Sequence, residues 1–333
     1  MTQPDSPSQS LHHSRVPSAV QRPLQSPLRG IVLKCLSVVV FTLMASIVKA
    51  TARDGLGVPP GQQVFFRSLF AIPVILIWLA WRHELGVGLK TFRPMGHLYR
   101  GIIGTAAMGM GFWALALLPF PEVTAIGYAA PLLTVIFAAM FLGEDVRLFR
   151  LSMVVLGLIG VVIVLSPRLT FGNAGMGYKE SLGAMVTLSG AACTALAQIF
   201  IRKLVQEERT SAIVFWFSVT STLLGLLTIP FGWVMPDAKT AALLVTIGLL
   251  GGLGQILLTS AYRYADASLV APFEYASMLL AILIGWFIFD EAPTVVMLAG
   301  AALVITAGIL IIWRERQLGL ERNRQRKAMT PQG

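Results

Sequence analysis

Apolar residues gather in ten long runs separated by short polar segments. Each run is close to the roughly 20 residues that an α-helix needs to cross the hydrocarbon core of a bilayer. The pattern therefore predicts an all-α, polytopic membrane protein with ten transmembrane helices. We expect these helices over residues 31–51, 61–81, 101–119, 122–142, 150–166, 182–202, 211–234, 241–262, 267–289 and 294–313.

Two segments of the chain, residues 101–146 and 248–293, align with each other without a gap. Each belongs to a half with five predicted helices, and an odd number of spans places the second half upside down relative to the first. Two inverted five-helix repeats are typical of secondary transporters. The aligned identities include Gly101 with Gly248, Gly104 with Gly251, Tyr128 with Tyr275, and Glu144 with Glu291.

The predicted spans divide the chain into two membrane units with a linker and two tails. The beginning of the chain is rich in Ser, Pro and Gln and has no apolar core, which is typical of a disordered tail and not of a secretory signal. We expect a disordered cytoplasmic tail over 1–30, the first repeat over 31–166, an external linker over 167–181, the second repeat over 182–313, and a basic cytoplasmic tail over 314–333.

Composition and charge exclude several classes of protein. With 56% hydrophobic and 13% charged residues, the chain is too apolar for a soluble domain. Its net charge of +10 does not indicate a nucleic-acid partner, because the cations lie in short loops and tails between the apolar runs. Placing both termini in the cytoplasm puts most Lys and Arg on that side, as the positive-inside rule requires. We therefore expect the lipid bilayer, and not a nucleic acid, to be the partner of these cationic residues.

A proline in the fourth predicted helix indicates a break in that helix. Pro131 removes a backbone hydrogen bond and frees the carbonyl of Gly127. Gly127 is the repeat counterpart of Glu274 in the ninth helix. The freed carbonyl of the fourth helix and the carboxyl group of the ninth therefore occupy equivalent positions in the two halves. Freed carbonyls in a membrane are tolerated where they line a cavity. We interpret these two helices as the walls of a shared site, with a plain kink as the alternative.

Two ionisable residues, Arg67 and Glu274, lie well inside apolar runs. A charge at the centre of a membrane costs about 2.5–3.5 kcal/mol on insertion scales, so such residues usually mark a pathway. For Glu274 we expect binding of a cationic substrate group or proton exchange, since burial favours its neutral form. The alternative is a carboxylate that bridges helices near the cytoplasmic mouth. Arg67 either binds substrate or ties freed carbonyls and hydroxyls together.

Four other charged residues lie at the ends of predicted helices. Lys34 and Lys49 bracket the first helix, where their long side chains can reach the two interfaces, so we interpret both as anchors. Glu144 and Glu291 come just before the fifth and tenth helices, where a helix N-terminus favours a carboxylate. Helix capping is the interpretation for both.

Aromatic residues at cavity depth are candidates for contact with a solute. The repeat-matched Tyr128 and Tyr275 could stack a flat ring or supply hydroxyl groups. Phe112 and Trp113 on the third helix are further candidates. The predicted substrate-binding residues are therefore Glu274, Tyr275, Tyr128, Trp113, Phe112 and Arg67.

The chain offers no pattern expected of a membrane-embedded enzyme. The four histidines, His12, His13, His83 and His97, are expected in the N-terminal tail or a cytoplasmic loop, without metal-ligand spacing. We therefore predict no catalytic residue, cofactor or metal. The two cysteines fall inside apolar runs, where they read as small packing residues.

The order of several short motifs resembles the EamA family of the drug/metabolite transporter superfamily. The motifs are Phe66-Arg67-Ser68, Ala130-Pro131, Phe141-Leu142-Gly143-Glu144, Phe289-Asp290-Glu291, and Gly300 with Gly308. One departure is Asp290, which stands where the first half has Gly143. The resemblance implies a bacterial inner-membrane carrier that works by alternating access around a central cavity. We predict a hinge-like exchange in which the fourth and ninth helices, with the glycine-rich third and eighth, open this cavity to alternate sides.

Two classes of substrate fit the residues. A flat vitamin such as riboflavin would use Tyr128, Tyr275 and Trp113, and its uptake is the favoured expectation. A cationic or zwitterionic metabolite would use Glu274, whether exported or imported; examples are an amino acid derivative, a compound like S-adenosylmethionine, or a quaternary amine. Coupling to protons is a further expectation, and the oligomeric state is left open by the sequence.

Overall fold

The computed structural model describes residues 26–53, 57–142, 148–168, 178–204, 207–265 and 271–329. Within these ranges nine helices are long and apolar enough to cross a membrane, and a shorter apolar helix supplies the remaining span. The all-α fold with ten crossings is therefore confirmed. The elements are α1 (Pro27–Arg53), α2 (Pro60–Trp81), α3 (Leu85–Gly88), α4 (Pro94–Leu117), α5 (Phe120–Gly127), α6 (Ala129–Leu142), α7 (Leu148–Leu165), η1 (Ser166–Arg168), α8 (Tyr178–Leu204), α9 (Thr210–Leu226), η2 (Ile229–Phe231), α10 (Ala238–Tyr264), η3 (Ala271–Tyr275), α12 (Ala276–Phe289) and α13 (Val295–Met329).

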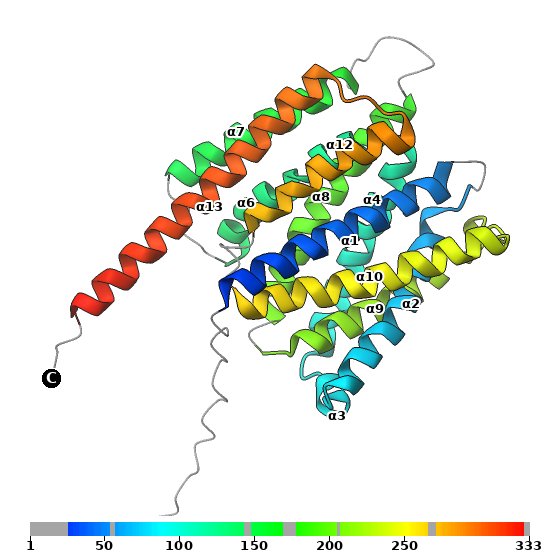
Figure 1. Ribbon diagram of the computed structural model, residues 1–333, viewed down its shortest axis with the longest axis horizontal. Coiled ribbons are helices and arrows are strands. Elements are labelled where there is room, and N and C mark those ends of the chain that lie inside the picture. The colour runs from blue at the N-terminus through cyan, green and yellow to red at the C-terminus, as the bar shows by residue number, and fades with distance from the viewer. Residues whose placement is uncertain are drawn as a thin grey trace, which may run out of the picture.

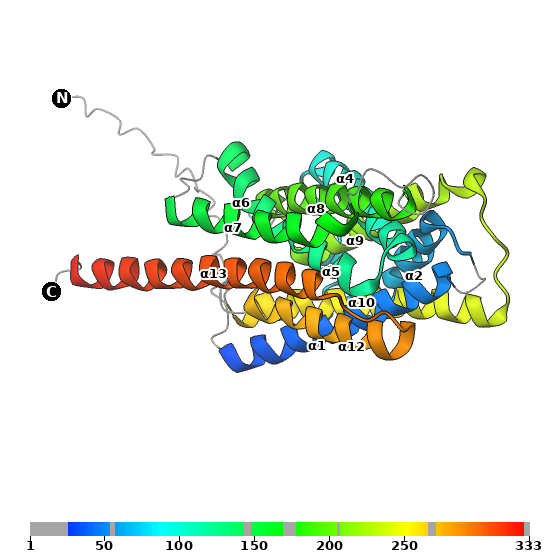
Figure 2. The same ribbon diagram turned by 90° about the horizontal axis from the view of Figure 1, so that it is seen from above.

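The start of α1 and the end of α13 lie on the same side of the bundle (Figures 1 and 2). We call this side the terminal face and the other side the opposite face. Helix α13 runs on to Met329, so the segment expected as a tail from residue 314 continues the last helix. Residues 1–25 of the expected N-terminal tail and 169–177 of the expected linker lie outside the described ranges.

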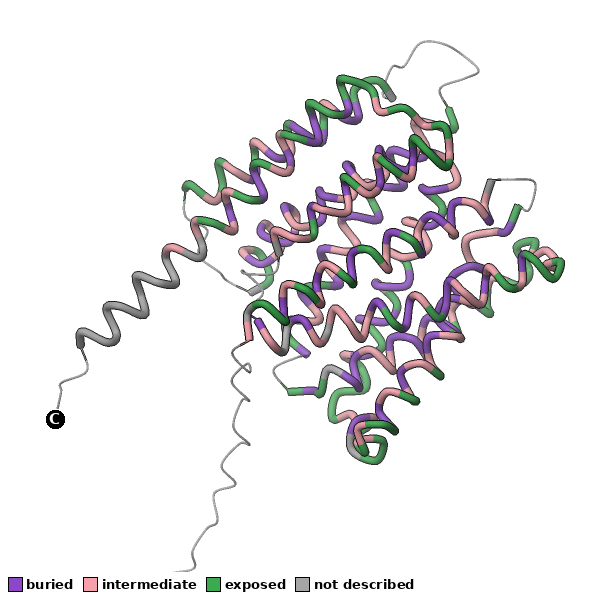
Figure 3. The backbone as a smooth tube through the Cα atoms, viewed as in Figure 1, coloured by how far each residue is buried: buried purple, intermediate pink, exposed green. Residues whose placement is uncertain are grey.

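Buried residues gather on the faces that the helices turn toward one another (Figure 3). Large apolar side chains remain exposed on the outside of the bundle, as expected where lipid is the solvent. On α7 they recur every three or four residues, which places them on one outward stripe. That stripe consists of Leu148, Leu151, Val155, Ile159 and Val162.

Helices α7 and α13, the last spans of the two halves, cross at a pair of glycines. A methyl group added to Gly160 would lie 2.8 Å from the Gly300 carbonyl oxygen, and one added to Gly300 would lie 2.7 Å from that of Gly160. Small residues at such a crossing let two backbones approach closely.

We expect Gly160→Ala to destabilise the protein, because the new methyl group would lie 2.8 Å from the Gly300 carbonyl oxygen and 3.0 Å from the Val304 backbone nitrogen, which no side-chain rotation can relieve. Alanine is otherwise the better helix former by about 1 kcal/mol. Gly111→Ala in α4 is the matched control, since a methyl group there meets nothing within 4 Å. Thermal unfolding in detergent should give a lower midpoint for Gly160→Ala only; equal midpoints for the two variants would contradict the close crossing.

Repeat-matched residues meet one another in the middle of the bundle. The rings of Tyr128 and Tyr275 are in edge-to-face contact, with centroids 5.0 Å apart. Side chains on the second span of each half also pack against the matched glycines on the third. Arg67 of α2 lies on Gly251 of α10, and Phe217 of α9 lies on Gly104 of α4. These contacts agree with the inverted repeat found in the sequence.

The fourth and ninth spans are both broken, as Pro131 predicted for the fourth. Helix α5 ends at Gly127 and α6 begins at Ala129, while α12 is preceded by the 3₁₀ turn η3. The ninth span ends at Asp290 in a left-handed conformation, with φ 54° and ψ 37°. Glycine is favoured there and aspartate is among the residues that tolerate it. This conformation explains why the departure from glycine at Asp290 is accommodated.

Candidate substrate site

A cavity of about 260 Å³ opens between α1, α5, α10 and the broken ninth span. Helix α1 contributes one face of the cavity, with lining residues at spacings of three and four. Ligand pockets commonly have volumes from about 300 Å³ upward, so this cavity suits a small metabolite or the head group of a larger one. The lining consists of Lys34, Ser37, Val38, Phe41, Thr42, Ala45, Phe120, Thr124, Leu258, Glu274 and Ser277.

Lys34 and Glu274 bring opposite charges to the cavity wall. The Lys34 Nζ lies 3.4 Å from Oε2 of Glu274; the lysine side chain is 3% exposed and the glutamate 52%. The interpretation of Lys34 as an interfacial anchor is therefore wrong. Helix α1 begins at Pro27 and not at residue 31, which places Lys34 about 10 Å inside it. Proline at the first helical position is a start signal that would have located this residue.

Glu274 lies in η3, where the ninth span is not yet an α-helix. Because its side chain is 52% exposed, the expectation of a buried carboxyl group is wrong. The turn is held by hydroxyl groups: Ser277 donates to the Glu274 carbonyl at 2.8 Å. The Tyr128 hydroxyl in turn shares a hydrogen bond of 2.6 Å with Ser277. Tyr128 thus connects the break in the fourth span to the segment that carries Glu274.

The two matched tyrosines pack against each other and do not line the cavity. Their rings meet at an angle of 69°, and Tyr128 and Tyr275 are 6% and 8% exposed. The Tyr275 hydroxyl packs against Gly308 of α13, where there is no room for a further methyl group. Gly308 therefore accommodates this ring. Neither tyrosine is among the residues that line the cavity.

The other predicted contacts are not among the residues that line the cavity. Phe112 is buried in a core cluster that also contains Phe120, while Trp113 is 42% exposed. Arg67 is buried between α2, α9 and α10. Of the six predicted substrate-binding residues, only Glu274 lines the cavity described here.

A buried ion pair lies between the cavity and the opposite face, and we interpret it as the closed end of the cavity. The Lys49 Nζ lies 3.0 Å from Oε1 of Glu291, with side-chain exposures of 0% and 9%. The same ammonium donates to the carbonyls of Leu118 at 2.7 Å and Leu115 at 3.2 Å. Oε2 of Glu291 accepts from the backbone N–H of Phe120 at 2.7 Å. Because Phe120 also lines the cavity, this network forms its closed end.

Two sequence interpretations change at this closed end. Lys49 does not reach the membrane interface, so its interpretation as an anchor is wrong. Glu291 caps α5 through the N–H of Phe120, while at the start of α13 the N–H of Met297 donates to the Thr294 hydroxyl. Its repeat counterpart Glu144 lies outside the described residues.

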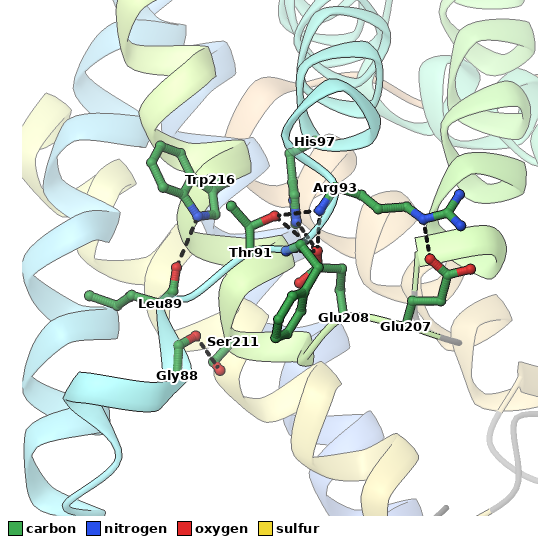
Figure 4. A network of polar contacts seen from close by, with 10 residues as sticks. Gly88, Leu89, Thr91, Arg93, His97, Glu207, Glu208, Ser211 and Trp216 are labelled. Atoms are coloured by element: carbon green, nitrogen blue, oxygen red, sulfur yellow. Dashed lines mark hydrogen bonds and ion pairs between the residues drawn. The ribbon is translucent and has the colours of Figure 1, made fainter. Parts of the chain in front are cut away.

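A second polar network joins the two halves at the terminal face (Figure 4). His97, expected in a loop, lies in the first turn of α4 and is 3% exposed. Its Nε2 is 3.6 Å from Oε1 of Glu208, which follows α8. The same Oε1 accepts from Phe92 N at 2.6 Å, Arg93 N at 2.8 Å and Thr91 Oγ1 at 2.9 Å. Glu208 thus holds the loop before α4 against the loop after α8.

This contact should weaken in acid. Burial alone raises the pKa of the Glu208 carboxyl group, but the hydrogen bonds from Phe92, Thr91 and Arg93 and the nearby His97 outweigh it, so the pKa lies below 4.5. The contribution to stability is then complete above pH 4.5 and is lost as the pH falls through the lowered value. We expect Glu208→Gln to cost about 1–3 kcal/mol near neutrality. The difference in unfolding midpoint between Glu208→Gln and the unmodified protein should become smaller as the pH falls below 4.5; a difference that stays constant would contradict this account.

The EamA-like transporter family matches the chain over residues 28–166 and 181–313, which together include all ten membrane crossings. The chain belongs to the EamA-like transporter family. The two matched segments coincide with the two inverted halves of the bundle. The protein is therefore a multi-pass membrane transporter of small molecules.

Relatives of this chain are named for the transport of different compounds. The chain is 28% identical over 291 residues to the S-adenosylmethionine uptake transporter of Rickettsia bellii, covering 86% of this chain and 97% of that one. It is 30% identical over 287 residues to the pseudopaline exporter CntI of Pseudomonas aeruginosa, covering 85% and 95%. It is 30% identical over 290 residues to the riboflavin transporter of Rhizobium johnstonii, covering 86% and 91%.

A solved crystal structure shares the fold of this family member. The two superpose with a TM-score of 0.63 at 21% sequence identity, and the superposition covers 88% of this chain and 99% of the other. At that identity the likeness concerns the arrangement of the helices alone.

Proposed function

We propose that this EamA family member carries a zwitterionic or cationic metabolite across the bacterial inner membrane by alternating access. The observation that carries the proposal is the Lys34–Glu274 pair on the wall of the cavity. A carboxylate of the solute can take the place of Glu274 beside Lys34, while an ammonium or another cationic group of the solute binds Glu274. Exchanging partners in this way keeps the buried lysine neutralised throughout, which matters because an isolated buried charge is costly.

The flat-ring alternative, uptake of riboflavin, has weaker support in the geometry. It required the two tyrosines to present their rings to a solute, whereas Tyr128 and Tyr275 pack against each other. The relative in Rhizobium johnstonii named as a riboflavin transporter keeps this alternative in the experiment below. The relative named for S-adenosylmethionine uptake supports the zwitterionic class, because that compound carries a carboxylate, an ammonium and a sulfonium group.

Alternating access follows from the two ends of the cavity. The Lys49–Glu291 pair closes it toward the opposite face, and the half-exposed Glu274 stands toward the terminal face. With both termini in the cytoplasm, as the distribution of Lys and Arg supports, this conformation is open to the cytoplasm. If transport is coupled to protons, Glu274 is the carboxylate in reach of both solvent and solute.

Counterflow in proteoliposomes tests the proposal. Vesicles containing the purified protein are preloaded with one unlabelled solute and the entry of labelled S-adenosylmethionine, labelled amino acids, labelled choline and labelled riboflavin is measured. We expect exchange among the zwitterionic or cationic solutes. The carboxyl methyl ester of a zwitterionic solute keeps its cationic group but cannot pair with Lys34, so it should compete more weakly than the solute itself. Exchange of riboflavin alone would refute the proposal and support the vitamin class.

A further inference from the structure

A second group of buried charges lies inside the bundle, apart from the cavity. The guanidinium carbon of Arg67 lies 5.7 Å from the centroid of the Phe217 ring, and that of Arg100 lies 4.2 Å from the same centroid. The two arginines are only 4% and 9% exposed. They come from α2 and α4, so two cations from separate helices of the first half converge on one ring of the second half.

These guanidinium groups lack the partners that buried charges normally have. The Nε and Nη1 atoms of both arginines are buried without a hydrogen-bond partner. Among the described residues, no carboxylate forms an ion pair with either arginine. Lys34 and Lys49, by contrast, each face a glutamate. Contact with an aromatic face attracts a cation, but it leaves the N–H donors of the guanidinium unused.

The surroundings make room for these groups and add polar atoms. A methyl group on Gly251 would lie 3.0 Å from Nε of Arg67, and one on Gly104 would overlap Nη1 of Arg100. The two repeat-matched glycines therefore leave space for the two guanidinium groups. One turn from Phe217, Ser221 shares a hydrogen bond of 2.7 Å with Thr105, both of them buried.

We propose that Arg67 and Arg100 form a binding site for a small monovalent anion within the bundle. The free N–H donors of a guanidinium match the oxygens of a carboxylate, and a chloride ion could also neutralise the excess positive charge. The site would therefore take either an inorganic anion or an organic carboxylate. It shares no residue with the lining of the cavity, so it does not depend on the proposed substrate.

Anion-dependent thermal stability of the full-length protein in detergent tests the site. Sodium chloride, formate or acetate replaces a bulky sulfonate buffer salt at constant ionic strength. We expect a saturable rise in the unfolding midpoint, because a ligand that binds only the folded state stabilises it. Arg67→Gln and Arg100→Gln should weaken the apparent anion affinity about 10- to 100-fold. Arg82→Gln is the control, since Arg82 pairs with Glu84 at the terminal face and should keep the full rise.

The outcomes separate the two sources of the anion. A saturable rise with chloride supports a site for inorganic anions, and a rise with formate or acetate alone supports a carboxylate site. No saturable rise, or the same rise in the Arg67→Gln and Arg100→Gln variants, would overturn the proposal. Should the glutamine variants fail to fold, Arg100→Lys keeps the charge and removes the planar fork; it must bind formate more weakly than the unmodified protein. No transported solute enters this assay, so its failure is distinguishable from failure of the proposed function.

Discussion

Glu291→Gln should destabilise the protein by about 3–5 kcal/mol, the usual cost of removing one partner from a buried ion pair. The Lys49 ammonium keeps its two carbonyl acceptors but loses the negative charge of Glu291, at a position with no exposure to water. Thermal unfolding in detergent, with the fraction of folded protein checked by size-exclusion chromatography, measures the loss. Asp290→Asn is the matched control, because it removes the same charge one residue away at an exposed position.

A double variant separates the charge from the packing. Lys49→Met with Glu291→Gln removes both charges and keeps similar side-chain lengths, and apolar replacement of a buried pair is often neutral or stabilising. The double variant should therefore be more stable than Glu291→Gln alone. If Glu291→Gln unfolds within about 0.5 kcal/mol of the unmodified protein, the range of an ordinary surface change, the pair does not hold the closed end together.

Glu274→Gln should abolish most transport while leaving the amount of folded protein in the membrane unchanged. Glutamine keeps an oxygen that can accept a hydrogen bond from the buried Lys34, and half of the Glu274 side chain is already solvent-accessible, so this replacement should cost less stability than Glu291→Gln. A hydrogen bond to a charged group is worth about 1.5–3 kcal/mol, which predicts a loss of about 10- to 100-fold in transport efficiency. Initial rates over a range of solute concentrations measure this loss. Glu84→Gln, at the terminal face and outside the cavity, is the control.

Lys34→Gln tests the other half of the same pair. In the Lys34→Gln variant, transport of a zwitterionic solute should be impaired, because its carboxylate loses the lysine. Transport of a solute that has only a cationic group should be unaffected. For a neutral solute, both Glu274→Gln and Lys34→Gln should be tolerated. Normal kinetics in Glu274→Gln would remove this residue from the substrate site.

The arrangement of helices could be predicted because lipid imposes strong rules on a sequence. Each span must satisfy its own backbone, so apolar runs of the right length become helices. The gapless alignment showed that the two halves are repeats, and the odd number of spans in each half predicted that they are inverted. Even the break at Tyr128 followed from Pro131, since proline cannot donate a hydrogen bond within a helix.

The site was only partly predictable, because its pairs join residues far apart in the sequence. Glu274 stood out as a charge within an apolar run. Its partner Lys34 lies 240 residues away, and placing the start of α1 four residues late made that lysine seem interfacial. Symmetry explains the tyrosines: side chains related by a two-fold axis and close to it meet each other. The match between Tyr128 and Tyr275 therefore indicated mutual contact as much as a shared ligand.

Phe120 belongs to the cavity lining and to the closed end at once. Its side chain faces the solute, while its backbone N–H is bound by the carboxylate that also faces Lys49. We therefore expect a solute that displaces the Phe120 ring to disturb the hydrogen bond between the Phe120 N–H and Glu291. Binding in the cavity and release of the Lys49–Glu291 pair would then depend on the same residue.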